Sequence, residues 1–119
     1  MKRTDGDYQD AVQAAVDILR ECARQAQDIS YGDLSAELRE RGFTGIRPHH
    51  GIMTHLLKDV CLHGNEDGRA PMLSALVVNK ASRVPSEQFS VLARGLPFSR
   101  PGDWTWQDER RAVFAAFRD

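Results

Sequence analysis

The chain has 119 residues, of which 41% are hydrophobic and 28% are charged, and its formal net charge is −1. This length and composition are typical of one globular domain with one hydrophobic core, and they argue against a disordered chain or a fibrous repeat. The near-zero net charge argues against a dedicated strong nucleic-acid binder, because neutralising phosphates normally requires a surplus of basic residues.

The N-terminus and the cysteines indicate the compartment. The chain opens with Met1-Lys2-Arg3 and no apolar stretch follows, so we expect neither a secretory signal nor a membrane span. Cys22 and Cys61 are the two cysteines, and both fall in predicted helices. Without a secretory signal they are expected to be reduced packing residues, so we place the protein in the cytoplasm.

The first part of the chain predicts two helices. Apolar or small residues recur every three or four positions between residues 7 and 25, which indicates one amphipathic helix. Ile29-Ser30 is compatible with a very short strand. Ser30 stands three residues before Asp33, a pattern typical of a capped helix start, and Gly42 is a typical helix end.

A third helix is predicted from Pro48 to about His63, because proline suits the first helical position. Its inner side is apolar: Ile52, Met53, Leu56, Leu57 and Val60. Its opposite side carries Arg47, Thr54 and Lys58, with His55 near the edge. One side therefore faces the core and the other is free.

The last third of the chain predicts a strand, a loop and two helices. Residues 72–78 form a short apolar run with β-branched residues, which favours a buried strand, and residues 79–85 form a loop. A short helix is expected after Ser86, with an inner side formed by Phe89, Leu92, Ala93 and Leu96. Thr105 and Asp108 form a second capping pattern, and the helix that follows has an apolar side formed by Trp106, Val113, Phe114 and Phe117.

These elements predict a single α+β domain, residues 1–119, with about five helices and a small sheet. The order is helix, short strand, helix, helix, strand and then a loop containing Lys80 and Arg83. This is the order of a winged helix, in which the third helix enters the DNA major groove. We therefore classify the chain as winged-helix-like.

The histidines do not predict a metal site. All four lie between residues 49 and 63, and an ordinary polar helix face accounts for them best. His49 and His50 would point about 100° apart on a helix, and neither H-E-x-x-H nor paired C-x-x-C spacing occurs. We expect no metal and no other cofactor.

The sequence does not predict an enzyme either. Cys22 belongs to an inner helix side, and Cys61 lies near a helix C-terminus, whose dipole raises a thiol pKa. Neither the G-x-S-x-G motif nor a P-loop nor the dinucleotide-binding glycine pattern is present.

The function predicted from these patterns is non-catalytic binding, with weak contact to DNA through the third helix and the basic loop. The candidate nucleic-acid-binding residues are Arg47, His50, Thr54, His55, Lys58, Lys80 and Arg83. The alternative is a small protein-interaction module, such as an immunity, inhibitor or defence accessory protein, or a homodimer. The near-neutral charge and the aromatic residues Phe98, Trp104, Trp106 and Phe117 motivate this alternative, although most of these aromatic residues are expected in the core.

Residues 29–34, with the sequence ISYGDL, resemble the opening of the winged-helix domain in alkylguanine-DNA alkyltransferases and alkyltransferase-like proteins. The resemblance implies a helix-turn-helix that begins at this segment. The region that corresponds to the reactive strand, residues 71–78, lacks both the cysteine and the P-C-H-R motif, so alkyl transfer is not implied. Residues 73–80, with Pro85 and Phe89, are also similar to a group of small uncharacterised bacterial proteins, which implies a shared architecture.

Overall fold

The structure is a computed structural model that describes residues 6–48 and 51–117. The elements within these ranges are α1 (Gly6–Arg24), β1 (Ile29–Ser30), α2 (Tyr31–Glu40), α3 (Gly51–Leu62), the 3-10 helix η1 (Leu73–Leu76), β2 (Val77–Val78), α4 (Glu87–Arg94) and α5 (Trp106–Phe117). The α+β class with five α-helices and a small sheet is therefore confirmed. None of the helices in these ranges combines the length and the apolarity that crossing a bilayer requires.

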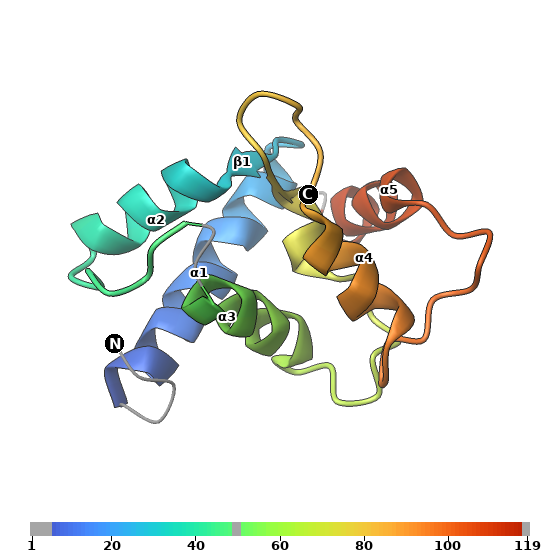
Figure 1. The fold of residues 1–119 in the computed structure, drawn as a ribbon, viewed down its shortest axis with the longest axis horizontal. Helices are drawn as coiled ribbons and strands as arrows, with labels where there is room; N and C mark the ends of the chain where they lie inside the picture. Colours follow the sequence, from blue (N-terminus) through green and yellow to red (C-terminus); the bar gives the residue numbers. More distant parts are fainter. Residues whose placement is uncertain (1–5, 49–50, 118–119) are drawn as a thin grey trace.

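Helix α1 lies at the centre of the fold and contacts α2, α3, η1 and α5 (Figure 1). Its predicted periodicity is confirmed, because the residues at three- and four-residue spacing are buried: Tyr8, Ala11, Val12, Ala15, Val16 and Leu19. The alanines on this side let neighbouring segments approach the helix backbone closely. One core thus forms around α1.

The sheet has two short parallel strands, β1 and β2, with Ile29 opposite Val77 and Ser30 opposite Val78. The prediction of a strand over residues 72–78 is wrong for its first part, because Leu73–Leu76 form the 3-10 helix η1. Side chains of α5 form hydrogen bonds with backbone groups that would pair with β1 in a longer strand. Trp106 Nε1, for example, donates to the carbonyl of Ala75 at 2.7 Å. Only the last two residues pair with β1.

The two predicted helix caps are confirmed. Ser30 Oγ accepts a hydrogen bond from the amide of Asp33 at 3.0 Å, and α2 begins at Tyr31, directly after Ser30. Thr105 Oγ1 accepts from the Asp108 amide at 3.2 Å, while Asp108 accepts from the Thr105 amide at 3.1 Å. These bonds satisfy amides that have no partner inside a helix, so each fixes where its helix starts.

A buried ion pair, which the sequence did not predict, joins α5 to the loops that precede it. Glu109 is 4% exposed, and its carboxylate accepts hydrogen bonds from Arg100 Nε at 2.7 Å, the Met72 amide at 2.9 Å and Trp104 Nε1 at 2.9 Å. Arg100 also donates to the carbonyl oxygens of three loop residues: Gly68, Ala70 and Phe98. We call Arg100 and Glu109 with these partners the Glu109 cluster.

We expect the Glu109 cluster to stabilise the fold less in acid. Burial by itself would raise the pKa of Glu109, but the hydrogen bonds from Arg100, Met72 and Trp104 outweigh burial and hold the pKa below its usual value. A carboxylate with a lowered folded-state pKa stabilises the fold fully above its unfolded pKa, about 4.3, and this stabilisation is lost as the pH falls through the folded-state pKa.

Urea titrations of the wild type and of Glu109→Gln measure this effect. The variant has no titrating carboxylate at this position, so the difference in free energy of unfolding should be largest at pH 7 and should shrink below about pH 4. A difference that stays constant down to pH 3 would contradict the expectation.

Candidate nucleic-acid interface

Helix α3 has one buried side and one exposed side, as predicted. Leu56 and Val60 are buried against α1, whereas Thr54, His55 and Lys58 are exposed on the other side. Within the described residues α3 spans Gly51–Leu62, and Pro48, which was predicted as the first helical residue, lies in a turn. The structure thus brings three predicted site residues together on one helix.

The segment before α3 carries Arg47, which is exposed. Its neighbour Ile46 is buried, and Ser35 Oγ of α2 donates a hydrogen bond to the Ile46 carbonyl. This anchor fixes the loop against α2 and leaves Arg47 pointing outward. The predicted site residue His50 lies outside the described residues.

The basic loop, residues 79–84, is closed by its own backbone. The Asn79 amide donates to the Val84 carbonyl and the Arg83 amide donates to the Asn79 carbonyl, both at 2.8 Å. Arg83 adopts a left-handed backbone conformation with φ 58°, which turns the chain back toward α4. Lys80 is exposed at this loop.

Arg83 is engaged within the protein. Its guanidinium forms an ion pair with the carboxylate of Asp28, and Arg110 of α5 lies 3.5 Å from the second oxygen of that carboxylate. Part of the positive charge predicted for the loop is therefore already neutralised. Lys80 has no such pair among the interactions of the described residues.

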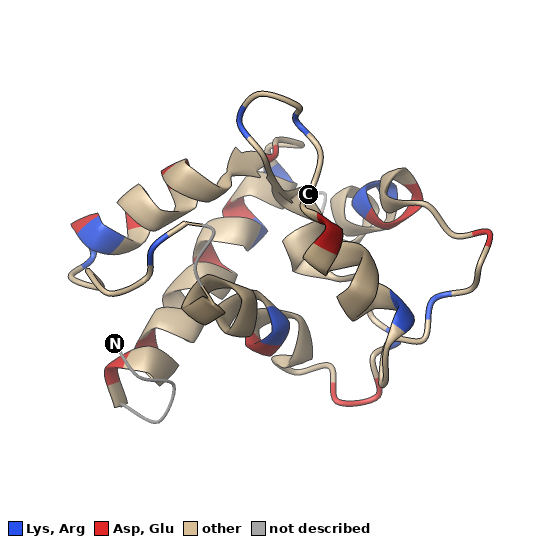
Figure 2. Cartoon of the chain, viewed as in Figure 1, with Lys and Arg blue, Asp and Glu red and all other residues tan. Residues whose placement is uncertain are grey.

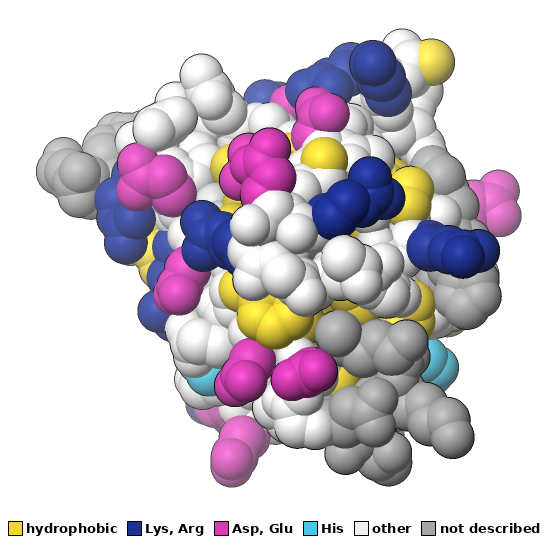
Figure 3. Space-filling view, turned by 90° about the vertical axis from the view of Figure 1, so that its left-hand side faces the viewer, with side chains coloured by type: hydrophobic (Ala, Val, Ile, Leu, Met, Phe, Trp, Pro, Cys, Tyr) yellow, Lys and Arg dark blue, Asp and Glu magenta, His cyan; other side chains and the backbone are white. Residues whose placement is uncertain are grey.

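The basic residues are spread over the molecule and do not form one patch. Figure 2 shows blue segments at the end of α2, in the linker before α3, in α3, in the basic loop and in α5. On the side of the molecule that carries α2, basic and acidic side chains are interspersed (Figure 3). The face shown in Figure 3 therefore carries both signs of charge.

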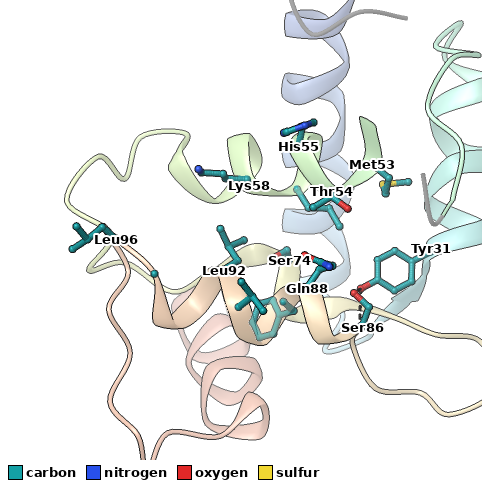
Figure 4. A pocket seen from close by; sticks show the side chains of 14 residues that line it. Tyr31, Met53, Thr54, His55, Lys58, Ser74, Ser86, Gln88, Leu92 and Leu96 are labelled. Carbon is teal, nitrogen blue, oxygen red and sulfur yellow. Dashed lines mark hydrogen bonds between the residues drawn. The ribbon is translucent and has the colours of Figure 1, made fainter. Parts of the chain in front are cut away.

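A pocket of about 510 Å³, which was not predicted from the sequence, lies between α3 and α4. Thr54, His55 and Lys58 line it on the α3 side, where Thr54 points toward α4 in Figure 4, and α4 forms the opposite wall. Leu96, which was predicted to face inward, is 86% exposed at the outer end of the pocket. That prediction is wrong because α4 ends at Arg94, so Leu96 does not continue its inner side.

The thiol pKa of both cysteines is raised above its usual value. Cys61 is buried with its Sγ 3.1 Å from Ser74 Oγ, and burial raises the pKa of its thiol to about 11. Burial also raises the pKa of Cys22, with a smaller effect from the nearby Glu37. The predicted direction for Cys61 is confirmed, although burial rather than the helix end is its main cause. Among the described residues, no three His, Cys, Asp or Glu side chains are grouped as a metal site requires.

The aromatic residues near the C-terminus belong mainly to the core. Phe98 is 4% exposed, and Trp104, Trp106 and Phe117 are partly buried and pack against the core. Trp104 also contacts Phe89 of α4, with ring centroids 5.7 Å apart. These residues therefore stabilise the fold and do not form an exposed aromatic surface.

The function has to be inferred from this geometry. Comparisons of the chain with protein-family models, with curated proteins and with solved structures found no match.

Proposed function

We propose that this protein is a non-catalytic, winged-helix-like binding protein that contacts DNA weakly through α3 and the basic loop. The supporting observation is the placement of α3: its apolar side is fixed in the core and its opposite side exposes Thr54, His55 and Lys58. In helix-turn-helix proteins the second helix of the motif is presented to the major groove in this way.

The order of elements agrees with this proposal. Helices α2 and α3 follow β1, and β2 leads directly into the basic loop, to which we assign the role of a wing. The basic loop and the exposed side of α3 are therefore the surfaces that would contact phosphates.

The charges predict that the affinity is low and depends strongly on salt. Lys58 and Lys80 are exposed, but Arg83 is paired with Asp28 and the chain as a whole is slightly acidic. Few phosphates can then be neutralised, and such contacts weaken quickly as salt is added.

Fluorescence anisotropy with a labelled DNA duplex at low salt tests the proposal. Lys58→Glu should weaken binding about tenfold, because it removes a phosphate contact and places a negative charge on the surface of α3. The matched control is Arg111→Glu, which makes the same change of charge on the exposed side of α5 and should leave binding nearly unchanged.

Two results would contradict the proposal. One is the absence of measurable binding by the wild type at low salt. The other is binding that Lys58→Glu and Arg111→Glu weaken equally, since this would indicate a response to net charge alone.

A further inference from the structure

The pocket between α3 and α4 has the size and lining of a small-molecule site. Its volume of about 510 Å³ lies within the range of about 300 to 1,000 Å³ that such sites usually have. Apolar side chains of both helices form its walls, among them Met53 and Leu57 of α3 and Phe89 and Leu92 of α4. In Figure 4, Leu92 of α4 points toward α3 across the pocket. An apolar ligand body would fit between the helices.

Two apolar side chains at the outer edge of the pocket are unusually exposed. Val91 is 68% exposed and Leu96 is 86% exposed, and both line the pocket. Contact of apolar surface with water is unfavourable by about 25 cal/mol per Å². A ligand that covered these side chains would therefore gain free energy in addition to that from the pocket walls.

The hydroxyl groups deep in the pocket already bind other groups of the protein. Tyr31 Oη donates to Ser86 Oγ at 3.2 Å and accepts from the Ser86 amide at 3.0 Å. Ser74 Oγ lies 3.1 Å from the Cys61 sulfur. The inner end of the pocket thus has little capacity to bind a charged group, and we expect it to receive the apolar end of a ligand.

The charged side chain at the rim of the pocket favours a negatively charged ligand. None of the residues that line the pocket is acidic, whereas Lys58 lies on its α3 side. Gln88 of α4 lies near Ser74 in Figure 4, apart from Lys58. A negatively charged group at the rim would be attracted by Lys58.

We propose that the pocket between α3 and α4 binds a small amphipathic carboxylate, with its apolar body between the helices and its carboxylate beside Lys58. This inference goes beyond DNA contact, and it is tested in the absence of nucleic acid. The two proposals therefore fail independently.

Three probes with the same chain length separate the contribution of charge from that of apolar burial: decanoate, 1-decanol and decylammonium. Binding is measured by amide chemical-shift changes in two-dimensional NMR spectra of the ¹⁵N-labelled protein. Decanoate should shift the amides of residues 53–58 and 88–96. It should bind about five- to tenfold more tightly than decanol, and decylammonium should bind most weakly.

Two variants and one control variant locate the site. Lys58→Gln should reduce the affinity for decanoate to about that for decanol, whereas Lys80→Gln, the same change on the basic loop, should leave it unchanged. Val91→Asp places a negative charge at an exposed position of the rim. It should therefore weaken the binding of decanoate more than the binding of decanol. Because Val91 and Lys58 are exposed, both variants are expected to fold normally.

Three results would overturn the proposal. Equal affinities for the three probes would show that the site has no preference for an anion. Shifts confined to residues outside the pocket would place decanoate elsewhere. Binding by none of the probes would leave Val91 and Leu96 as a contact surface for a protein partner.

Discussion

Replacing Glu109 with alanine is expected to lower the free energy of unfolding by about 3 to 5 kcal/mol, because removing one member of a buried ion pair leaves the other without compensation. The remaining Arg100 side chain is only 14% exposed, and its charge would lose the carboxylate that it contacts at 2.7 Å. The Met72 amide and the Trp104 indole would also lose their acceptor. Since small domains are stable by only about 5 to 15 kcal/mol, the variant should be close to unfolding at physiological temperature.

Urea denaturation followed by circular dichroism measures this change. Glu66→Ala is the matched control, since Glu66 is exposed, and it should change the free energy of unfolding by less than about 0.5 kcal/mol. A double-mutant cycle with Arg100→Ala then isolates the interaction between Arg100 and Glu109. A loss for Glu109→Ala no larger than that of the control would show that the cluster does not stabilise the fold.

The second large effect is expected at Gly68, where alanine should cost about 3 to 5 kcal/mol of folding stability. Gly68 has a φ of +73°, and a Cβ atom at this position would lie 2.6 Å from the carbonyl carbon and oxygen of Pro97. The strain therefore has two sources, the left-handed backbone and a contact with backbone atoms that cannot rotate away. The Gly68 carbonyl also accepts a hydrogen bond from Arg100, so any displacement would disturb the Glu109 cluster.

Gly64→Ala separates these two sources. Gly64 has a similar φ of +64°, but a Cβ atom there would meet nothing within 4 Å. Its substitution should therefore cost only the left-handed backbone term, about 1 to 2 kcal/mol. Thermal and urea denaturation of the two variants compare them directly, and equal losses would show that the close approach of Pro97 to Gly68 is unimportant.

The sequence predicted those parts of the fold that depend on neighbouring residues. The cap at Ser30 and Asp33 and the cap at Thr105 and Asp108 each connect positions three residues apart, so the local pattern is sufficient. The two sides of α3 follow from helical spacing in the same way, because one turn brings every third or fourth side chain to the same side.

Features that depend on distant segments could not be read in this way. Residues 72–76 resemble a strand in composition, yet Trp106 and Glu109 of α5 bind their backbone groups. Glu109 was not among the residues predicted to be buried. It lies three residues after Trp106 and four before Val113, which places it on the inner side of α5, and that spacing was the available signal.

The candidate site was predicted in part. Thr54, His55 and Lys58 are exposed together, but the sequence could not show that Arg83 pairs with Asp28, 55 residues earlier in the chain. It also could not show the pocket, because its lining comes from α2, α3, η1 and α4. Such a cavity exists only after these segments pack together.

The shared carboxylate of Asp28 has a consequence for any polyanion that approaches the basic loop. A phosphate that contacts Arg83 competes with Asp28 for the same guanidinium, and an Asp28 carboxylate that loses Arg83 still has Arg110 3.5 Å away. Added salt weakens both the old and the new contact of Arg83, so the two effects partly cancel. The number of counterions released on association should therefore be smaller than the number of arginines and lysines that touch the polyanion.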